Sequence, residues 1–89
     1  MKTVFINGVF DLFHPGHVAV LRFAKAQGDM LTVGVNSDSS ARELGKNPVM
    51  TEGERAIMVL TIADAVFTFD EKLPYESIVN VRPDVLVVG

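Results

Sequence analysis

Two histidines three residues apart, His14 and His17, are the side chains in this sequence best placed to do chemistry. They straddle the predicted start of a helix, and Gly16 between them removes a side chain where a ligand could approach the backbone. The first turn of a helix offers unpaired N–H groups and a partial positive charge. Together with two imidazoles, these groups predict a site for an anion such as the phosphates of a nucleotide, where transfer depends on positioning and charge stabilisation.

Other interpretations of the histidine pair stay open on the residues alone. Two surface histidines at this spacing need have no function, and imidazoles at positions i and i+3 can also share a metal ion. A zinc site needs a third ligand, and Asp11 is the candidate nearby. Phosphate binding, metal binding and no function are therefore the three alternatives at this point.

The composition narrows the class of protein. A chain of 89 residues has room for one small domain, so residues 1–89 are expected to form a single unit. A hydrophobic content of 48% is typical of a globular protein, and the net charge of −3 gives no electrostatic footprint for nucleic acid. The chain has no cysteine, which excludes disulfides and thiolate catalysis and is consistent with a cytoplasmic location. We expect no membrane span and no signal peptide, because no apolar run is long enough.

The elements that must position the histidines alternate along the chain. Apolar strand-like runs are predicted at residues 3–6, 30–35, 65–69 and 84–88. Helices are predicted at residues 17–27, from a Thr51-x-x-Glu54 capping box onward, and from Pro74 to the Arg82-Pro83 step. At most a helical turn is expected at the start of the polar stretch 39–49. Continuous apolar strands alternating with helices indicate an α/β fold with a parallel sheet covered on both faces.

The same patterns predict how the helices end and pack. Gly28 stands where a glycine often ends a helix. The buried face of the second long helix is expected at Ile57, Leu60 and Ile62, and that of the third at Tyr75, Ile78 and Val79. Ligands of open parallel sheets bind beyond the carboxyl ends of the strands. The polar and titratable residues are concentrated in the two loops there, at residues 7–16 and 36–50.

Residues 8–17, Gly-Val-Phe-Asp-Leu-Phe-His-Pro-Gly-His, resemble the G-x-F-D-x-x-H-x-G-H signature of the cytidylyltransferase-like nucleotidyltransferases. This ten-residue match is far more specific than His-x-x-His alone. Asn36-Ser37-Asp38 and Glu54-Arg55 resemble further elements of that family, so the resemblance covers essentially the whole chain. Phe69-Asp70-Glu71 and residues 82–87 are similar to the bacterial sugar-phosphate branch, which includes heptose 1-phosphate adenylyltransferase, and glycerol-3-phosphate cytidylyltransferase is the other near relative. The resemblance implies a Rossmann-like three-layer sandwich.

The resemblance also implies a reaction. A nucleoside monophosphate would pass from ATP or CTP to a phosphorylated sugar or alcohol, such as heptose 1-phosphate or glycerol 3-phosphate, and pyrophosphate would leave. Mg²⁺ would accompany the triphosphate, and no covalent enzyme intermediate is expected. The alternative is a non-catalytic nucleotide-binding module that keeps the histidine loop. Neither a nucleic acid nor a membrane is an expected partner.

Four residues receive catalytic roles from the resemblance. His14 and His17 would contact the phosphates and stabilise charge in the transition state. Arg55 would hold the triphosphate or the acceptor phosphate, and its position in the first turn of a helix, which the dipole disfavours for a cation, favours a ligand role over a solvated one. Lys46 lies in a loop where the family keeps basic residues for the phosphates, with a solvated lysine as the alternative.

Binding roles follow in the same way. Asp11 would position the histidine loop or act near the metal, with a plain turn residue as the alternative. Asp38 would lie by the acceptor or the nucleotide, or would cap a helical turn through Ser39-Ser40. Phe10 is also expected to fix the loop from the core. The nucleotide-binding positions that the signature implies are Gly8, Val9, Phe10, Asp11 and Gly16.

The resemblance predicts that the family domain continues beyond this sequence. The chain stops at the end of the fourth predicted strand, whereas family members continue with a fifth strand and a last helix. We therefore expect a C-terminally truncated domain. A missing strand would leave a sheet edge or an apolar face uncovered, and this predicts a homo-oligomer.

Overall fold

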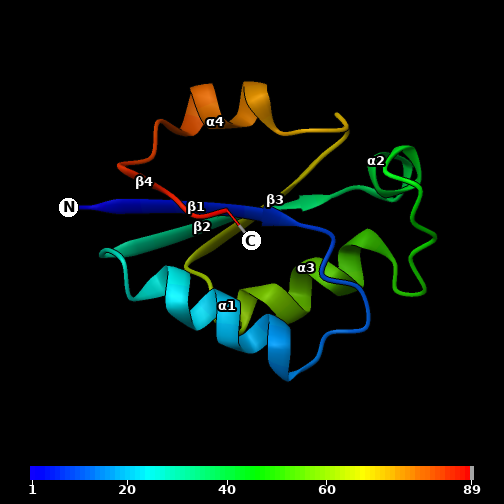
Figure 1. The fold of residues 1–89 in the computed structure, drawn as a ribbon, viewed down its shortest axis with the longest axis horizontal. Helices are drawn as coiled ribbons and strands as arrows, with labels where there is room; N and C mark the ends of the chain where they lie inside the picture. The colour runs from blue at the N-terminus through cyan, green and yellow to red at the C-terminus, as the bar shows by residue number, and fades with distance from the viewer. Residues whose placement is uncertain (89) are drawn as a thin grey trace.

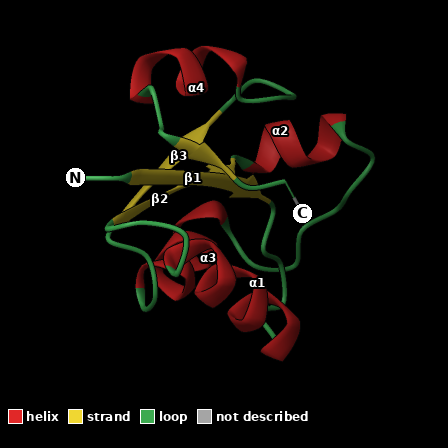
Figure 2. Cartoon of the chain, turned by 60° about the vertical axis from the view of Figure 1, so that its left-hand side comes forward, coloured by secondary structure: helices red, strands yellow, loops and turns green. Residues whose placement is uncertain are grey.

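In the computed structural model, which describes residues 1–88, the chain forms a parallel sheet with helices on both faces (Figure 1). The strands are β1 Thr3–Gly8, β2 Met30–Asn36, β3 Ala65–Phe69 and β4 Val85–Leu86. The helices are α1 Pro15–Lys25, α2 Asp38–Glu43, α3 Glu52–Leu60 and α4 Tyr75–Val81. Figure 2 shows α1 and α3 on one side of the sheet and α4 on the other. The predicted three-layer α/β fold is confirmed.

The strand order β3-β2-β1-β4 places β1 inside the sheet, and all three pairings are parallel. Val4, Phe5 and Ile6 of β1 are at most 2% exposed, as a strand covered on both faces requires. The main core lies between the sheet and the helices α1 and α3. Its buried members include Val4, Ile6, Leu21, Leu31, Val33, Val35 and Val59.

The amino-terminal edge of the sheet is closed by aspartates. Asp29 accepts a hydrogen bond from the Lys2 N–H at 2.6 Å, and Asp84 accepts one from the Thr3 N–H at 2.8 Å. Asp64 accepts one from the Leu31 N–H at 2.8 Å and also pairs with Lys25. Each carboxylate therefore satisfies a backbone donor where a strand begins.

Several predicted boundaries shift by a few residues. Helix α1 begins at Pro15 and ends at Lys25, so Gly28 lies beyond its end. Gly28 is needed for close packing instead, since a Cβ there would lie 2.7 Å from the Lys2 carbonyl oxygen. The fourth strand pairs only at Val85 and Leu86, which is shorter than the apolar run suggested.

The two predicted buried faces are wrong at most of their positions, although Ile62, just after α3, is half-buried and packs against the core. Ile57 and Leu60 of α3 are 67% and 53% exposed, and the buried positions of this helix are Arg55 and Val59. Helix α3 turns inward the face that carries an arginine, which apolar periodicity could not indicate. On α4, Tyr75 and Val79 are likewise exposed, and only Ile78 of the predicted stripe is half-buried.

Helix α2 is longer than the single turn expected from the sequence. Ser37 caps it, because its hydroxyl accepts the Ser40 N–H at 3.1 Å. The Ser40 hydroxyl accepts from the Asn36 amide at 2.9 Å and donates to the Glu71 carbonyl. These buried contacts tie α2 to the ends of β2 and β3, so the short helix sits firmly at the carboxyl edge of the sheet.

Candidate active site

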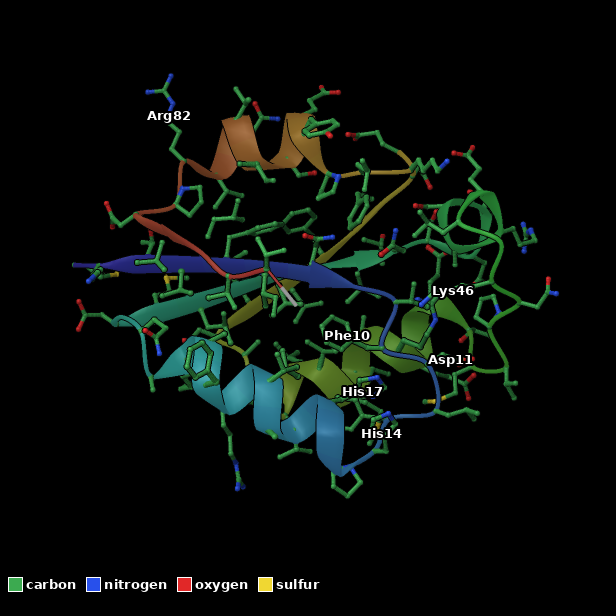
Figure 3. All side chains as sticks on the ribbon, in the orientation of Figure 1. Phe10, Asp11, His14, His17, Lys46 and Arg82 are labelled. Atoms are coloured by element: carbon green, nitrogen blue, oxygen red, sulfur yellow. The ribbon has the colours of Figure 1, made fainter. Side chains whose placement is uncertain are left out.

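The predicted site residues gather at the carboxyl end of β1, around a pocket of about 320 Å³. Figure 3 shows Phe10, Asp11, His14, His17 and Lys46 together at this end of the molecule. The residues that line the pocket are Ile6, Asn7, Gly8, Val9, Phe10, Asp11, His17, Val20, Lys46, Asn47 and Pro48. Four other predicted site residues do not line this pocket: His14, Gly16, Asp38 and Arg55. His14 instead borders a second, open groove along α1.

The loop before α1 has a constrained backbone. Phe10 and Leu12 have φ angles of 54° and 47°, in the left-handed region that non-glycine residues rarely adopt. The Phe10 ring is buried and meets the His17 ring edge-on at 5.5 Å. Gly8 makes room for this ring, since a Cβ there would lie 2.9 Å from Phe10 Cε2. Gly8 and Phe10 thus shape the loop, in line with the expected core role of Phe10.

The two histidines cap the helix that follows them. Nδ1 of His14 accepts the Gly16 N–H at 3.0 Å, and Nδ1 of His17 accepts the His14 N–H at 3.3 Å. The N–H groups of His17 and Val18 donate to the His14 carbonyl oxygen, and Pro15 has no N–H. The expectation of unpaired N–H groups at this helix start is therefore wrong, because the imidazoles and the His14 carbonyl take them.

These hydrogen bonds fix where each neutral imidazole carries its proton. A nitrogen that accepts a hydrogen bond is unprotonated, so both rings hold the proton on Nε2. The rings are stacked with centroids 3.9 Å apart. Burial, followed by the neighbouring His14, lowers the pKa of His17 below its usual 6.5, while Asp11 opposes the shift. At neutral pH His17 is therefore a neutral donor through Nε2.

Asp11 joins the histidine loop to the next loop along the same edge. Its two carboxylate oxygens accept the N–H groups of Val49 and Met50, both at 2.9 Å. The bond from Met50, followed by that from Val49, lowers the pKa of Asp11 below its usual 3.8. Within residues 1–88, no cluster of three or more histidine or carboxylate side chains could hold a metal ion. The geometry favours the positioning role expected for Asp11 over the metal role.

Arg55 is the connecting residue of the site. Its side chain has no exposed area, and its guanidinium donates to the carbonyl oxygens of Val9 at 2.8 Å, Asn36 at 2.7 Å and Met50 at 3.1 Å. It also pairs with Asp38 at 2.6 Å. In this structure these contacts join two loops to the end of β2 and the start of α2, and the phosphate role expected for Arg55 stays a prediction.

Asp38 and Lys46 lie on either side of this connection. Asp38 is the first residue of α2, which Ser37 caps, so the predicted capping role of Asp38 is wrong. Its carboxylate forms an ion pair with Arg55. Lys46 is exposed on the lip of the pocket, one residue after Gly45, whose φ is 81°. In the described part of the chain, no carboxylate pairs with the Lys46 ammonium. Lys46 therefore adds positive charge to the pocket.

Sequence reasoning missed part of the pocket wall. Asn7, Asn47 and Pro48 line it, and none of them was predicted individually. The available signal was their place in the two segments, residues 7–16 and 36–50, that follow the first two predicted strands. A parallel α/β sheet with a pocket at the carboxyl end of β1, lined by His17 and Lys46, places the chain in the class of α/β proteins that bind ligands at this edge of the sheet.

A family comparison agrees with this class. The model of the Cytidylyltransferase-like family matches residues 5–89, so the chain belongs to that family. The chain is 49% identical to the bifunctional protein HldE of Wolinella succinogenes and 50% identical to that of Koribacter versatilis. Each alignment covers 99% of this chain but 19% of the relative. The chain therefore spans about a fifth of the length of these relatives.

A solved structure has the same fold. The lipopolysaccharide core biosynthesis protein from Thermoplasma volcanium superposes with a TM-score of 0.89 at 35% identity, over 97% of this chain and 72% of that protein. This match confirms the predicted Rossmann-like arrangement. Among the helices of residues 1–88, none is long and apolar enough to cross a membrane.

Proposed function

We propose that this chain is the nucleotide-binding core of a nucleotidyltransferase that moves a nucleoside monophosphate from ATP or CTP to a phosphorylated sugar or alcohol. The observation that carries the proposal is the pair of stacked imidazoles with both Nδ1 atoms occupied, of which His17 lines the same pocket as Lys46. Membership of the family supports the reaction type. The solved relative is a lipopolysaccharide core biosynthesis protein, and this favours a saccharide acceptor over glycerol 3-phosphate.

The proposed chemistry needs charge stabilisation rather than an enzyme base. A phosphate monoester is already anionic at neutral pH, so its oxygen can attack the α-phosphorus without giving up a proton to the protein. A new P–O bond forms as the bond to the β-phosphate oxygen breaks, and pyrophosphate leaves with that electron pair. The Nε2–H groups of His14 and His17 donate to the α-phosphate oxygens as charge develops. The Lys46 ammonium holds the departing phosphates.

The buried contacts of the site serve this arrangement. Asp11 and Arg55 hold the histidine loop against the loop that carries Lys46, which keeps the donors at fixed spacing. Mg²⁺ is proposed to arrive bound to the triphosphate substrate. The described side chains do not form a metal site of their own.

Calorimetry with ATP and CTP, each with Mg²⁺, tests nucleotide binding on this chain. Pyrophosphate release with heptose 1-phosphate or glycerol 3-phosphate then tests transfer, and unphosphorylated sugar is the matched control. Saturable binding and release that requires the phosphorylated acceptor are expected. Binding without turnover would favour the non-catalytic module, and absence of binding would contradict the proposal. Light scattering at micromolar concentration tests the proposed homo-oligomer, which a strictly monomeric species would contradict.

A further inference from the structure

Gly16 is the second residue of α1 and lies against the imidazole of His14. A Cβ on Gly16 would lie 2.7 Å from His14 Cε1 and 2.9 Å from its Nδ1. Both distances are shorter than Cβ contacts in real proteins. Any side chain at this position must therefore displace the ring. The space that the sequence suggested for a ligand is filled by His14.

The position of the ring decides which nitrogen carries the proton. While the ring lies over Gly16, Nδ1 accepts the Gly16 N–H at 3.0 Å and Nε2 must hold the proton. A ring pushed off this amide loses the constraint, and both neutral tautomers become accessible. In that state His14 no longer offers a fixed Nε2–H donor beside the one from His17.

We propose that Gly16 is a positioning residue, whose missing side chain holds the His14 ring so that its Nε2 is the atom that offers an N–H donor. The partner of that donor, a nucleotide phosphate, rests on the proposed function. The placement of the ring is a property of the chain without ligand. The two rings are stacked and both Nδ1 atoms are bound to backbone N–H groups, so the pair offers two donors of the same kind.

The chain contains a matched control in α3. Gly53 is also the second residue of a helix, and that helix also begins with a capping box, between Thr51 and Glu54. The nearest heavy atom to a Cβ on Gly53 is the Thr51 hydroxyl oxygen, at 4.0 Å. Gly53→Ala therefore adds the same methyl group at the same helical position without displacing a capping side chain.

The test reads the histidine nitrogens directly, by long-range ¹H–¹⁵N NMR at neutral pH without nucleotide. In the wild-type chain both Nδ1 atoms are expected to be unprotonated and both Nε2 atoms protonated. In Gly16→Ala the His14 resonances should move to the average of two tautomers. The rate kcat of transfer should fall about 10²-fold, as for loss of one transition-state donor, with a smaller change in KM. Gly53→Ala should keep the wild-type spectrum and kcat.

Three outcomes would overturn the proposal. The first is a wild-type His14 with its proton on Nδ1. The second is a Gly16→Ala variant that loses kcat while His14 keeps its Nε2–H tautomer, because Gly16 would then serve ligand approach. The third is a Gly53→Ala variant that loses as much as Gly16→Ala. If the wild-type chain neither binds nor turns over nucleotide, the proposed function fails, whereas the spectra still decide the role of Gly16.

A double-mutant cycle keeps the proposal testable if Gly16→Ala folds poorly. The added methyl group should lower the urea midpoint only when the His14 ring is present. In a His14→Ala background, Gly16→Ala should leave the midpoint unchanged or raise it, because alanine is the better helix former. An equal fall in both backgrounds would contradict the clash with His14.

Discussion

Helices α1 and α3 begin with the same capping arrangement built from different side chains. In α3, the Thr51 hydroxyl accepts the Glu54 N–H at 3.2 Å and the Glu54 carboxylate accepts the Thr51 N–H at 2.9 Å. In α1, two imidazole nitrogens take the place of hydroxyl and carboxylate. Both arrangements accept hydrogen bonds from backbone N–H groups at the start of a helix, so both stabilise their helix in the same way.

The two caps differ in the charge of the first helical turn and in the hydrogen-bond donors that remain free. Helix α3 has Glu52 and Glu54 in its first turn, so its positive end is already compensated by its own carboxylates. Helix α1 has no acidic residue there, and each imidazole that accepts with Nδ1 keeps a donor on Nε2. Both caps begin a helix, but the imidazoles of the α1 cap keep N–H donors that bind an anion in the proposed function. A capping box made of histidines is therefore a functional signal.

The largest expected effect is a loss of kcat when His17, the third helical residue of α1, is removed. Glu54, at the same position of α3, is the matched control. His17→Ala should lower kcat by about 10²–10³-fold or more, because a transition-state donor is lost. Glu54→Ala should leave kcat unchanged. Each variant should lose about 1 kcal/mol of unfolding free energy, since each removes one cap contact. Transfer assays and urea unfolding measure both quantities, and unchanged turnover in His17→Ala would remove its proposed role.

Arg55, next to the α3 cap, should give the largest loss of stability. Arg55→Met removes a fully buried guanidinium and leaves Asp38 and three carbonyl oxygens without their partner. The free energy of unfolding should fall by about 3 kcal/mol, as when one member of a buried ion pair is removed. Arg42→Met, an exposed arginine of α2, is the control. A loss in Arg55→Met no greater than in this control would show that the loops do not depend on it.

The backbone of the loop before α1 is strained at Leu12, and a glycine at this position should relieve that strain. Leu12 has a φ of 47° and is 58% exposed, so its side chain contributes little to the core. Leu12→Gly should raise the free energy of unfolding by about 0.5–1 kcal/mol. Leu12→Ala keeps the strain and serves as the comparison. The thermal unfolding midpoints of the two variants test this expectation. Equal midpoints would show that the left-handed backbone at this position has no measurable cost in stability.

The smallest expected effect is a pH dependence confined to the α1 cap. The pKa of His17 is lower in the folded chain than its usual 6.5, mainly through burial. Its neutral form therefore stabilises the fold above pH 6.5, and this contribution is lost as pH falls from 6.5 toward the lowered pKa. Unfolding free energies between pH 7 and pH 5 should slope in the wild type and less in His17→Gln. Identical slopes in the wild type and in His17→Gln would show that another group is responsible for the pH dependence.

The arrangement of the sheet was predictable because its signals are local. Continuous apolar runs specify buried parallel strands, and Thr51 with Glu54 marks the start of α3 in the sequence itself. The burial of Arg55 was not predicted, because helical periodicity weighs apolar residues. It cannot show that a guanidinium will turn inward to bond two loops and the end of β2. The self-capping of His14 was equally invisible, since it depends on a ring conformation that spacing does not encode.

The strand order has a consequence for how the protein comes to be made. Strand β1 is synthesised before the other three strands but lies inside the finished sheet, between β2 and β4. Its link to the far end of the chain, from Thr3 to Asp84, spans 81 residues. Contacts this distant in sequence form late and slow the overall rate of folding. Until residue 85 is in place, one edge of β1 has no partner, so newly made chains present an apolar strand to their neighbours.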